Sequence, residues 1–281
     1  MTFSIVAYDP KTDELGVAVQ SKFISVGSVV PWAKAGVGAI ATQSVINTTY
    51  GPDGLKFLAE GKSVEETIKI LTDQDDGRDF RQVGIIDATG NGAAYTGKSC
   101  YDWAGDRVGK NCVAQGNILV SEAVVDQMVD VFEQTEGHLA ERLLTALDAG
   151  QAAGGDRRGK QAAALYIVKE KGGYLQKNDR MIDLRVDEHP DPIKELMRIY
   201  KLHQLYFGAT KKENILTIDE AIRKQIEQHL HRLGRIETTN IDDATFYKAL
   251  SDFHRMENFE GRELERGKID QDVLNFLVNL S

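Results

Sequence analysis

Alternation of apolar and polar side chains begins at the second residue of the chain. Residues 2–9 read TFSIVAYD, which has the two-residue period of a β-strand. A turn over 9–13 and a second alternating run over Leu15–Val19 complete a predicted β-hairpin. Because the first strand starts so early, we expect residue 2 to lie inside the folded body and not on a frayed tail.

Strand and helix patterns then continue to about residue 206. The runs after the first hairpin predict strands over 36–43, 82–87, 93–96, 112–115, 162–168 and 181–186. The predicted helices are Gly54–Glu60, a helix opened by the capping box of Ser63 and Glu66, one capped by Ser121 that reaches Phe132, one from Leu139 to Leu147, and Ile193–Tyr206.

The pattern changes after about residue 205, where strands disappear and charged residues become more frequent. Helical spacing there predicts three helices, over 217–233, 243–255 and 269–280. We place the boundary in the segment 208–214, which gives a domain over 1–206 and a small all-α domain over 207–281.

Composition narrows the classes of function. With 281 residues, 42% hydrophobic residues and a formal net charge of −9, the chain has no general affinity for nucleic acid or anionic membranes. It shows no secretory signal pattern and no apolar run long enough to span a bilayer, so we expect a cytoplasmic protein. The scattered histidines lack metal-ligand spacing, and no motif indicates a cofactor. Cys100 and Cys112 are interpreted as structural thiols, with a disulfide or a reactive thiol as alternatives.

Thr2 is the first candidate for chemistry. Removal of Met1 would leave Thr2 with a free α-amino group beside its hydroxyl, so one residue would supply both nucleophile and base. The alternative is a processed terminus without a chemical role. Ser21 and Lys22 end the second strand and are expected near Thr2, where the lysine would act electrostatically on the amine or would simply be solvated.

Other polar residues stand where predicted strands end. Thr42, Gln43 and Asn47 follow a strand of small residues and would form one wall of a pocket, or a turn that satisfies its own backbone. Asn117 closes the strand that begins at Cys112. The loop 153–161 (AGGDRRGKQ) contains Asp156 and is not a Walker loop, so we interpret it as an active-site loop, with a plain solvated turn as the alternative.

Six segments together carry a resemblance to a known family. The segments TFSIVAYD, GVAVQSK, AGVGAIATQ, QGN, AGGDRRGKQ and IDLRVDEHPDP resemble the DUF1028 family, a branch of the N-terminal-nucleophile hydrolase superfamily, across residues 2–206. The resemblance implies an α+β fold, a four-layer α-β-β-α sandwich of two antiparallel sheets between two layers of helices, with the nucleophile at the start of an inner strand. The tail looks like a small helical peptidoglycan-binding-like module.

The resemblance also bears on the site. Thr2 matches the nucleophile position, and Asp156 looks similar to the acidic residue that holds the threonine in proteasome-type peptidases. Those enzymes have an aspartate where this chain has Gln20, and their lysine has no clear equivalent here, Lys22 and Lys34 being the two candidates.

These observations predict an amide hydrolase that acts on a peptide or a small-molecule amide without a cofactor. Thr2, Lys22 and Asp156 are the predicted catalytic residues, and Ser21, Thr42, Gln43, Asn47 and Asn117 the predicted substrate-binding residues. The alternative is a non-catalytic binding or scaffolding protein on the same fold. The C-terminal module would bind a cell-wall fragment or a protein partner, and the sequence leaves a homo-oligomer open.

Overall fold

Two β-sheets form the centre of the first part of the chain in the computed structural model, which describes residues 2–280. The six-stranded sheet has the order β10-β9-β2-β1-β8-β7 and the four-stranded sheet the order β3-β4-β5-β6, with every neighbouring pair antiparallel. The strands are β1 Thr2–Asp9, β2 Glu14–Ser21, β3 Pro31–Lys34, β4 Gly38–Ser44, β5 Arg81–Asp87, β6 Gly92–Thr96, β7 Gly105–Gly109, β8 Cys112–Asn117, β9 Ala162–Val168 and β10 Arg180–Val186.

Strand β1 occupies an inner position of the larger sheet. It pairs with β2 on one side and with β8 on the other, and all eight of its residues are buried. In the register of these pairs, Thr2 lies opposite Ser21 of β2 and opposite Asn117 of β8. The predicted hairpin is therefore present, and residue 2 lies in the folded body.

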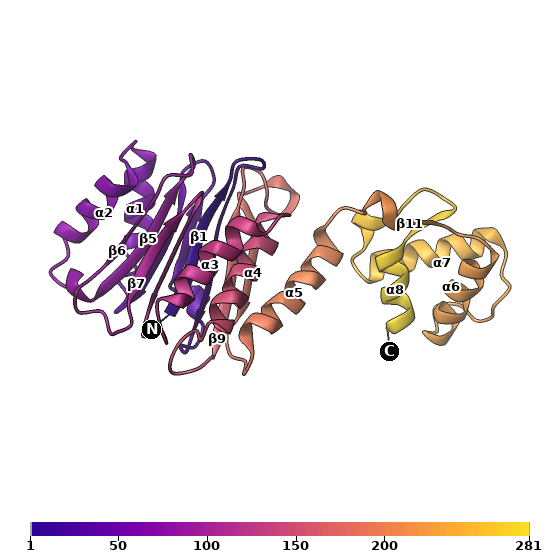
Figure 1. Cartoon of the computed structure of the whole chain (residues 1–281). Coiled ribbons are helices and arrows are strands. Elements are labelled where there is room, and N and C mark those ends of the chain that lie inside the picture. The colour runs from indigo at the N-terminus through magenta and orange to yellow at the C-terminus, as the bar shows by residue number, and fades with distance from the viewer. Residues whose placement is uncertain (1, 281) are drawn as a thin grey trace. The chain divides into compact units, whose positions relative to one another are not determined.

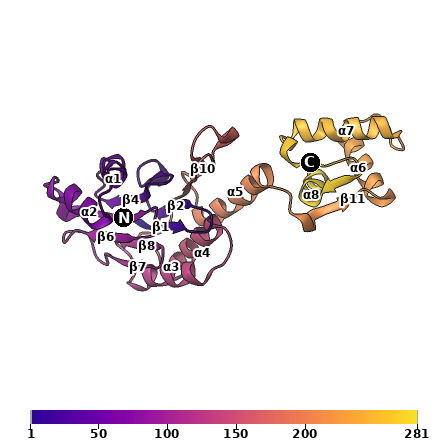
Figure 2. The ribbon, with the colours of Figure 1, turned by 90° about the horizontal axis from the view of Figure 1, so that it is seen from above.

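Helices cover the outer faces of both sheets (Figures 1 and 2). Helices α1 (Tyr50–Ala59) and α2 (Val64–Asp73) contact the four-stranded sheet, and α3 (Ala123–Gln134) and α4 (Leu139–Ala152) contact the six-stranded sheet. The capping box of Ser63 and Glu66 at the start of α2 is confirmed. The expectation for Ser121 was wrong, because α3 begins one residue later and its N-cap, Glu122, makes no side-chain cap.

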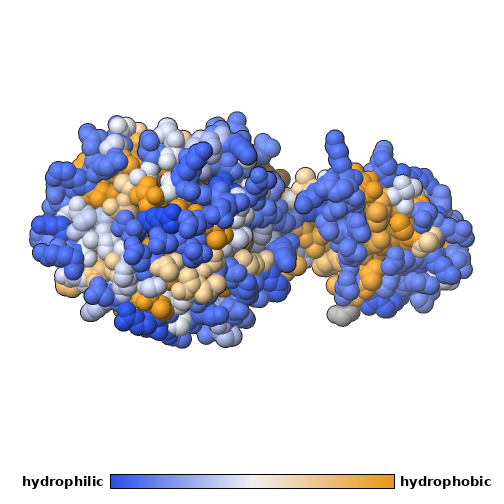
Figure 3. Space-filling model, viewed as in Figure 1, coloured by the Kyte–Doolittle hydropathy of each residue, from blue (hydrophilic) through white to orange (hydrophobic). Residues whose placement is uncertain are grey.

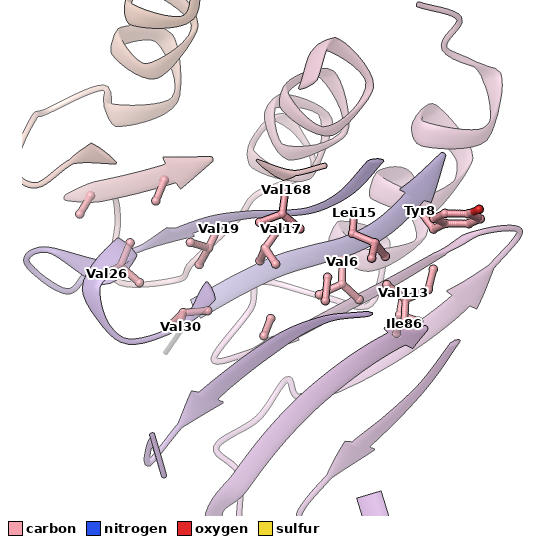
Figure 4. Close-up of a cluster of buried hydrophobic side chains, with 14 residues drawn as sticks. Val6, Tyr8, Leu15, Val17, Val19, Val26, Val30, Ile86, Val113 and Val168 are labelled. Carbon is pink, nitrogen blue, oxygen red and sulfur yellow. The ribbon is translucent and has the colours of Figure 1, made fainter. Parts of the chain in front are cut away.

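The inner faces of the two sheets pack against each other. Valine side chains from β1, β2 and β8 meet Ile86 of β5 in one cluster of buried side chains (Figure 4). We call this cluster the apolar end of the inter-sheet layer; it is formed by Val6, Tyr8, Leu15, Val17, Val19, Val26, Val30, Ala39, Ala41, Ile86, Val113, Ala162, Ala164 and Val168. Burial of this apolar surface is the main source of stability for the sheet pair.

The second part of the chain has a core of its own. The chain divides into two compact units, of which one ends at Arg198 and the other begins at Ile199, within α5 (Pro192–Phe207). The core of the second unit gathers side chains from α6 (Glu220–Arg232), α7 (Asp243–Met256) and α8 (Gln271–Asn279). Inside this unit, Arg262 and Asp270 form a buried ion pair with an N–O distance of 2.6 Å.

The prediction that strands disappear from this part of the chain was wrong. Two three-residue strands, β11 (Ile215–Thr217) and β12 (Lys268–Asp270), pair antiparallel. The remaining short elements are 3-10 helices at Val26–Ser28, Arg78–Phe80, Tyr174–Gln176, Lys212–Asn214 and Glu260–Arg262. Within residues 2–280 there are eight α-helices, and none is long and apolar enough to cross a membrane.

Candidate active site

Polar side chains collect at one end of the layer between the two sheets. Because alternate residues of a strand share a face, Thr2 and Ser4 lie on the same face of β1 as Val6. The same rule applies to β2, β4, β5 and β8, each of which has a polar residue in the inward phase at or next to one end. We call this group the polar end of the layer; its members, all buried, are Thr2, Ser4, Ser21, Gln43, Gln82, Gln115 and Asn117.

Thr2 is held by three strands. Only 2% of its surface is exposed, and its hydroxyl donates a hydrogen bond to Ser21 Oγ at 3.0 Å. Its carbonyl oxygen accepts a hydrogen bond from Gln43 Nε2 of the opposite sheet at 3.2 Å. The side chain that carries the hydroxyl is therefore fixed from within its own sheet, and its backbone is fixed from the facing sheet.

A chain of hydrogen bonds connects the two sheets next to Thr2. Gln115 Nε2 donates to Ser4 Oγ at 2.6 Å, and Ser4 Oγ donates to Gln43 Oε1, also at 2.6 Å. Gln43 Nε2 donates onward to Gln82 Oε1 at 2.9 Å. All four side chains are fully buried, so these bonds replace the water that the amides and the hydroxyl lose on folding.

Gln82 is the central member of this network. Its Oε1 accepts from Gln43 Nε2 and from Asn117 Nδ2, both at 2.9 Å. Its Nε2 donates to Gly116 O at 2.8 Å, to Thr96 Oγ1 at 2.9 Å and to Gly105 O at 3.2 Å. Because Gln82 comes from the four-stranded sheet and most of its partners come from the six-stranded sheet, it fixes the spacing of the sheets at the polar end.

Two buried oxygen atoms at the polar end have no hydrogen-bond partner among residues 2–280. They are Gln115 Oε1 and Asn117 Oδ1, in side chains whose nitrogen atoms each donate a hydrogen bond. A buried carbonyl oxygen without a donor costs about 1–3 kcal/mol. Asn117 lies directly opposite Thr2 in the sheet, so its unpartnered oxygen is an acceptor beside the candidate nucleophile.

Asp156 lies at the rim of this cluster and holds the backbone after Ser21. Its carboxylate accepts from Lys22 N at 3.1 Å, from Arg158 N at 2.9 Å, and from the Arg158 guanidinium at 2.8 and 3.2 Å. The side chain of Lys22 is exposed, and its Nζ donates to Lys160 O at 3.3 Å. The interaction between Asp156 and Lys22 is thus made by the backbone of the lysine and not by its ammonium group.

Two predicted binding residues lie outside the polar end. Thr42 follows Ala41 in β4 and so faces away from the inter-sheet layer, and its hydroxyl donates to Asn47 O at 3.1 Å. Asn47 Nδ2 donates to Asp75 at 3.0 Å, and Asp75 is paired with Arg81 at 2.9 Å. The Arg81 guanidinium holds the pKa of Asp75 well below its usual range. This charged group anchors the segment between α2 and β5.

Two family models match the sequence of the chain. A family model described as "Family of unknown function (DUF1028)" matches residues 2–196, well over half of the chain. The chain belongs to the DUF1028 family. A second model, described as "Putative peptidoglycan binding domain", matches residues 206–277 of this DUF1028 protein, so both resemblances seen in the sequence are confirmed.

Solved structures give one close and one distant likeness. A crystal structure of a DUF1028 protein from Silicibacter pomeroyi is 31% identical to this chain, with a TM-score of 0.67, and the match covers 74% of this chain and 91% of that one. Anbu (ancestral beta-subunit) from Yersinia bercovieri is 10% identical with a TM-score of 0.32, over 72% of this chain and 94% of that one. No curated protein matches the chain.

The thiols of this DUF1028 chain are unsuited to nucleophilic chemistry. Cys100 and Cys112 are both free and buried. Burial raises the pKa of the Cys112 thiol to about 12 and also raises the pKa of Cys100. At neutral pH both are therefore protonated, and a protonated thiol is a poor nucleophile. Within residues 2–280, no three histidine, cysteine or acidic side chains are grouped so as to hold a metal ion.

Four residues of the site were missed by sequence reasoning. Ser4, Gln82 and Gln115 lie inside strands β1, β5 and β8, and Arg158 binds Asp156 two residues earlier in the same loop. The signal for the first three is their phase: each has a polar side chain on the inward side of a strand that also carries an apolar residue of the inter-sheet layer on that side. The signal for Arg158 is weaker, because the loop contains two arginines and a lysine at similar spacing.

Proposed function

We propose that this DUF1028 protein is an amide hydrolase whose nucleophile is the hydroxyl of Thr2 once the peptide bond before Thr2 has been cleaved. The observation that carries the proposal is the position of Thr2. It stands at the start of an inner strand, in the polar end of a layer that is otherwise apolar, with its hydroxyl 3.0 Å from Ser21 Oγ. A terminal threonine in this position combines a buried nucleophile with its own amine as base.

The fold that we propose is the four-layer α-β-β-α sandwich of the N-terminal-nucleophile hydrolases. Support comes from the packing of α1 and α2 on the four-stranded sheet, of α3 and α4 on the six-stranded sheet, and of the two sheets on each other. We further propose that this domain extends over residues 1–206 and that residues 207–281 form the second domain.

The reaction would proceed in two steps. In the first, Thr2 Oγ forms a bond to the substrate carbonyl carbon, its proton passes to the Thr2 amine, and the amide nitrogen leaves with that proton. In the second, water adds to the resulting ester and releases a carboxylic acid and the free hydroxyl. Gln43 and Asn117 would bind the substrate amide, and backbone N–H groups at the strand ends would stabilise the oxyanion.

In this proposal Asp156 and Ser21 position the nucleophile. Asp156 fixes the backbone at Lys22, next to Ser21, and Ser21 accepts the hydrogen bond of the Thr2 hydroxyl. Because four donors already occupy the Asp156 carboxylate, we assign it no proton-transfer step. The Lys22 ammonium would require a different side-chain conformation to reach the Thr2 amine.

Labelling with an epoxyketone tests the nucleophile, because this electrophile needs both the hydroxyl and the free amine of an N-terminal threonine. Protein with a free Thr2 amine, verified by intact mass, should bind one epoxyketone molecule per chain, and Thr2→Val should not be labelled. Thr2→Ser should keep partial labelling. Protein in which the Thr2 amine is acetylated provides the matched control and should be inert. Equal labelling of wild type and Thr2→Val would assign the nucleophile to another residue and overturn the proposal.

We propose a second function for the C-terminal unit, the binding of a cell-wall fragment. The match of the peptidoglycan-binding model to residues 206–277 supports it, together with a half-open groove of about 580 Å³ along α7. Apolar side chains such as Ile236 and Phe253 line the groove beside polar groups such as Thr238 and Asp252. Apolar residues reach the surface of this unit (Figure 3).

A filled groove tests this second proposal. Ala249 lines the groove, whereas Ala244, one and a half turns earlier in α7, is exposed and does not. Ala249→Trp should abolish the binding of soluble muropeptides measured by calorimetry, and Ala244→Trp should leave it unchanged. Binding that survives Ala249→Trp would exclude the groove, and no binding by the wild type would leave a protein partner as the ligand of this unit.

A further inference from the structure

Two loops cross from one sheet to the other at the polar end. The first, residues 22–30, leaves β2 after Ser21 and enters β3 at Pro31, which pairs with Ala41 of β4. The second, residues 97–104, leaves β6 after Thr96 and enters β7 at Gly105. Together with the segment that follows β4 and the residue before β5, these loops surround the end of the layer at which Thr2 lies.

The side chains on these segments are large, apolar and exposed. Phe23 and Ile24 on the first loop are 47% and 57% exposed, and Tyr101 on the second is 63% exposed. Val45, after β4, is 50% exposed, and Phe80, before β5, is 46% exposed. We call these five residues the apolar rim. Isolated apolar residues on a surface are ordinary, but five on the segments around one site form a group with a shared position.

Each member of the apolar rim is tied to a residue of the polar end. Phe23 stands two residues after Ser21, and Val45 stands two residues after Gln43. Val45 N donates to Phe80 O at 3.2 Å, and the backbone of Tyr101 accepts from Ile118, the neighbour of Asn117, at 3.0 Å. Since two residues span at most roughly 7 Å, the backbones of Phe23 and Val45 lie within that distance of the backbones of Ser21 and Gln43.

The polar end itself is electrically neutral. Its hydroxyl and amide side chains carry no charge at any physiological pH, and the carboxylate of Asp156 beside it is already paired with Arg158. In the reactive form the Thr2 amine is also uncharged, because it acts as the base. A charged substrate group that entered this layer would then lose its hydration without gaining a counter-charge, which is strongly unfavourable. An uncharged amide, by contrast, can exchange hydrogen bonds with the buried side chains.

We propose that the apolar rim binds an aliphatic or aromatic group attached directly to the uncharged amide that Thr2 attacks. This inference rests on the proposed function, because it takes Thr2 as the point at which the substrate amide lies. The chemistry of the rim is the same whether the apolar group is on the acyl side or on the amine side of the amide. The substrate class is thus a neutral amide with an apolar substituent, and not an amide of a charged amino acid.

Binding of simple amides tests the proposal without any need for turnover. The full-length protein and its Thr2→Val variant are titrated with acetamide, octanamide, N-octylacetamide and the carboxylate-terminated analogue of octanamide. Each added methylene should tighten binding about two- to four-fold, because the transfer of one methylene from water is worth up to a four-fold change. Octanamide and N-octylacetamide distinguish the acyl side from the amine side. The carboxylate-terminated analogue should bind at least about ten-fold more weakly than octanamide.

Variants locate the binding site. Phe23→Ser and Tyr101→Ser should each weaken binding of the preferred octyl amide about ten-fold. Leu175 is the matched control, because it is 71% exposed and lies in the connection between β9 and β10, at the opposite end of β9 from Ser21. Leu175→Ser should leave binding unchanged.

The outcomes separate this inference from the proposed function. Epoxyketone labelling of Thr2 without any dependence of binding on chain length would overturn the apolar rim and leave the hydrolase intact. Octyl-amide binding that is lost in Phe23→Ser, in a protein that no epoxyketone labels, would support the apolar site and overturn the hydrolase. If Phe23→Ser changes the mass in light scattering but not the affinity for octyl amides, the rim is an interface between copies of the chain, and the proposal fails.

Discussion

The two ends of the inter-sheet layer are made by the same strands and differ in how they are held together. At the apolar end, valine side chains are held together by the burial of apolar surface, which requires no particular direction of contact. At the polar end, the contacts are hydrogen bonds of 2.6–3.3 Å, each with a fixed partner. Stability and the placement of side chains are therefore separated along the strands. Burial at the apolar end supplies most of the free energy of folding, and the hydrogen bonds at the polar end fix the positions of the side chains around Thr2.

A polar residue in the apolar end gives the largest expected effect. Val6→Asn should lower the free energy of unfolding by about 4 kcal/mol, through lost apolar burial and an amide without partners. Urea unfolding measures the change. Val108→Asn is the control, because Val108 is 51% exposed in β7, and it should stay within about 0.5 kcal/mol of the wild type. A small effect of Val6→Asn would mean that the two ends do not differ as described.

The central amide of the polar end should give the next largest effect. Gln82→Leu leaves the donors of Gln43 and Asn117 without their acceptor, and we expect a loss of about 3 kcal/mol, measured by urea unfolding. Gln127→Leu, at an exposed position of α3, is the matched control and should change little. If Gln82→Leu stabilised the protein, the polar end would behave as a second apolar core.

Response to pH sharpens the contrast between the neutral polar end and the charged group around Asp75. The pKa of Asp75 is lowered in the folded state by Arg81. Its contribution to stability is therefore complete above the unfolded value of about 3.9 and is lost as the pH falls below it toward the folded value. Asp75→Asn should lose less stability than the wild type between pH 5 and pH 2.5, as measured by urea unfolding.

The same titration applied to Gln82→Leu provides the comparison. Because no side chain of the polar end is ionised, the difference in stability between Gln82→Leu and the wild type, both with Met1 retained, should be equal at pH 5 and at pH 9. A difference that changed with pH would show that a titrating group takes part in the network.

The smallest expected effect comes from the residue with a buried oxygen that has no partner. Asn117→Leu removes an unpartnered acceptor together with one of two donors to Gln82 Oε1, which keeps the bond from Gln43. We expect the free energy of unfolding to change by less than about 1 kcal/mol, while epoxyketone labelling of Thr2 falls markedly. A loss of 2 kcal/mol or more would assign Asn117 to the structure and not to the site.

Much of the fold could be predicted from the sequence, because the residues within or next to many helices and strands mark where these elements begin and end. The alternation from residue 2, the capping box at Ser63 and the apolar faces of α3 and α4 are all local patterns. Strands β3 and β7 were missed: each has only four or five residues, and glycines or charged residues interrupt the alternation. Such strands form because a neighbouring strand offers hydrogen-bond partners, which no local pattern reveals.

The candidate site was predictable at its centre and not at its edges. Thr2, Ser21, Gln43 and Asn117 lie together because strand ends meet at one edge of a sheet. Thr42 is separated from them by the phase of its strand, since neighbouring residues face opposite sides. The amide network escaped prediction because the phase of a glutamine in its strand marks a buried position only once it is known which face of the strand meets the facing sheet.

The inner position of β1 also has a consequence for the order of events during synthesis. Strand β1 is made first, but one of its two neighbours is β8, which ends at Asn117. At 5–20 residues per second, the ribosome adds the residues between Thr2 and Asn117 in roughly 6 to 23 seconds. During that interval β1 lacks one of its two neighbours, whereas once β8 has paired only 2% of the surface of Thr2 is exposed. An enzyme that frees the Thr2 amine therefore meets a less covered strand on the nascent chain than it does after β8 has paired.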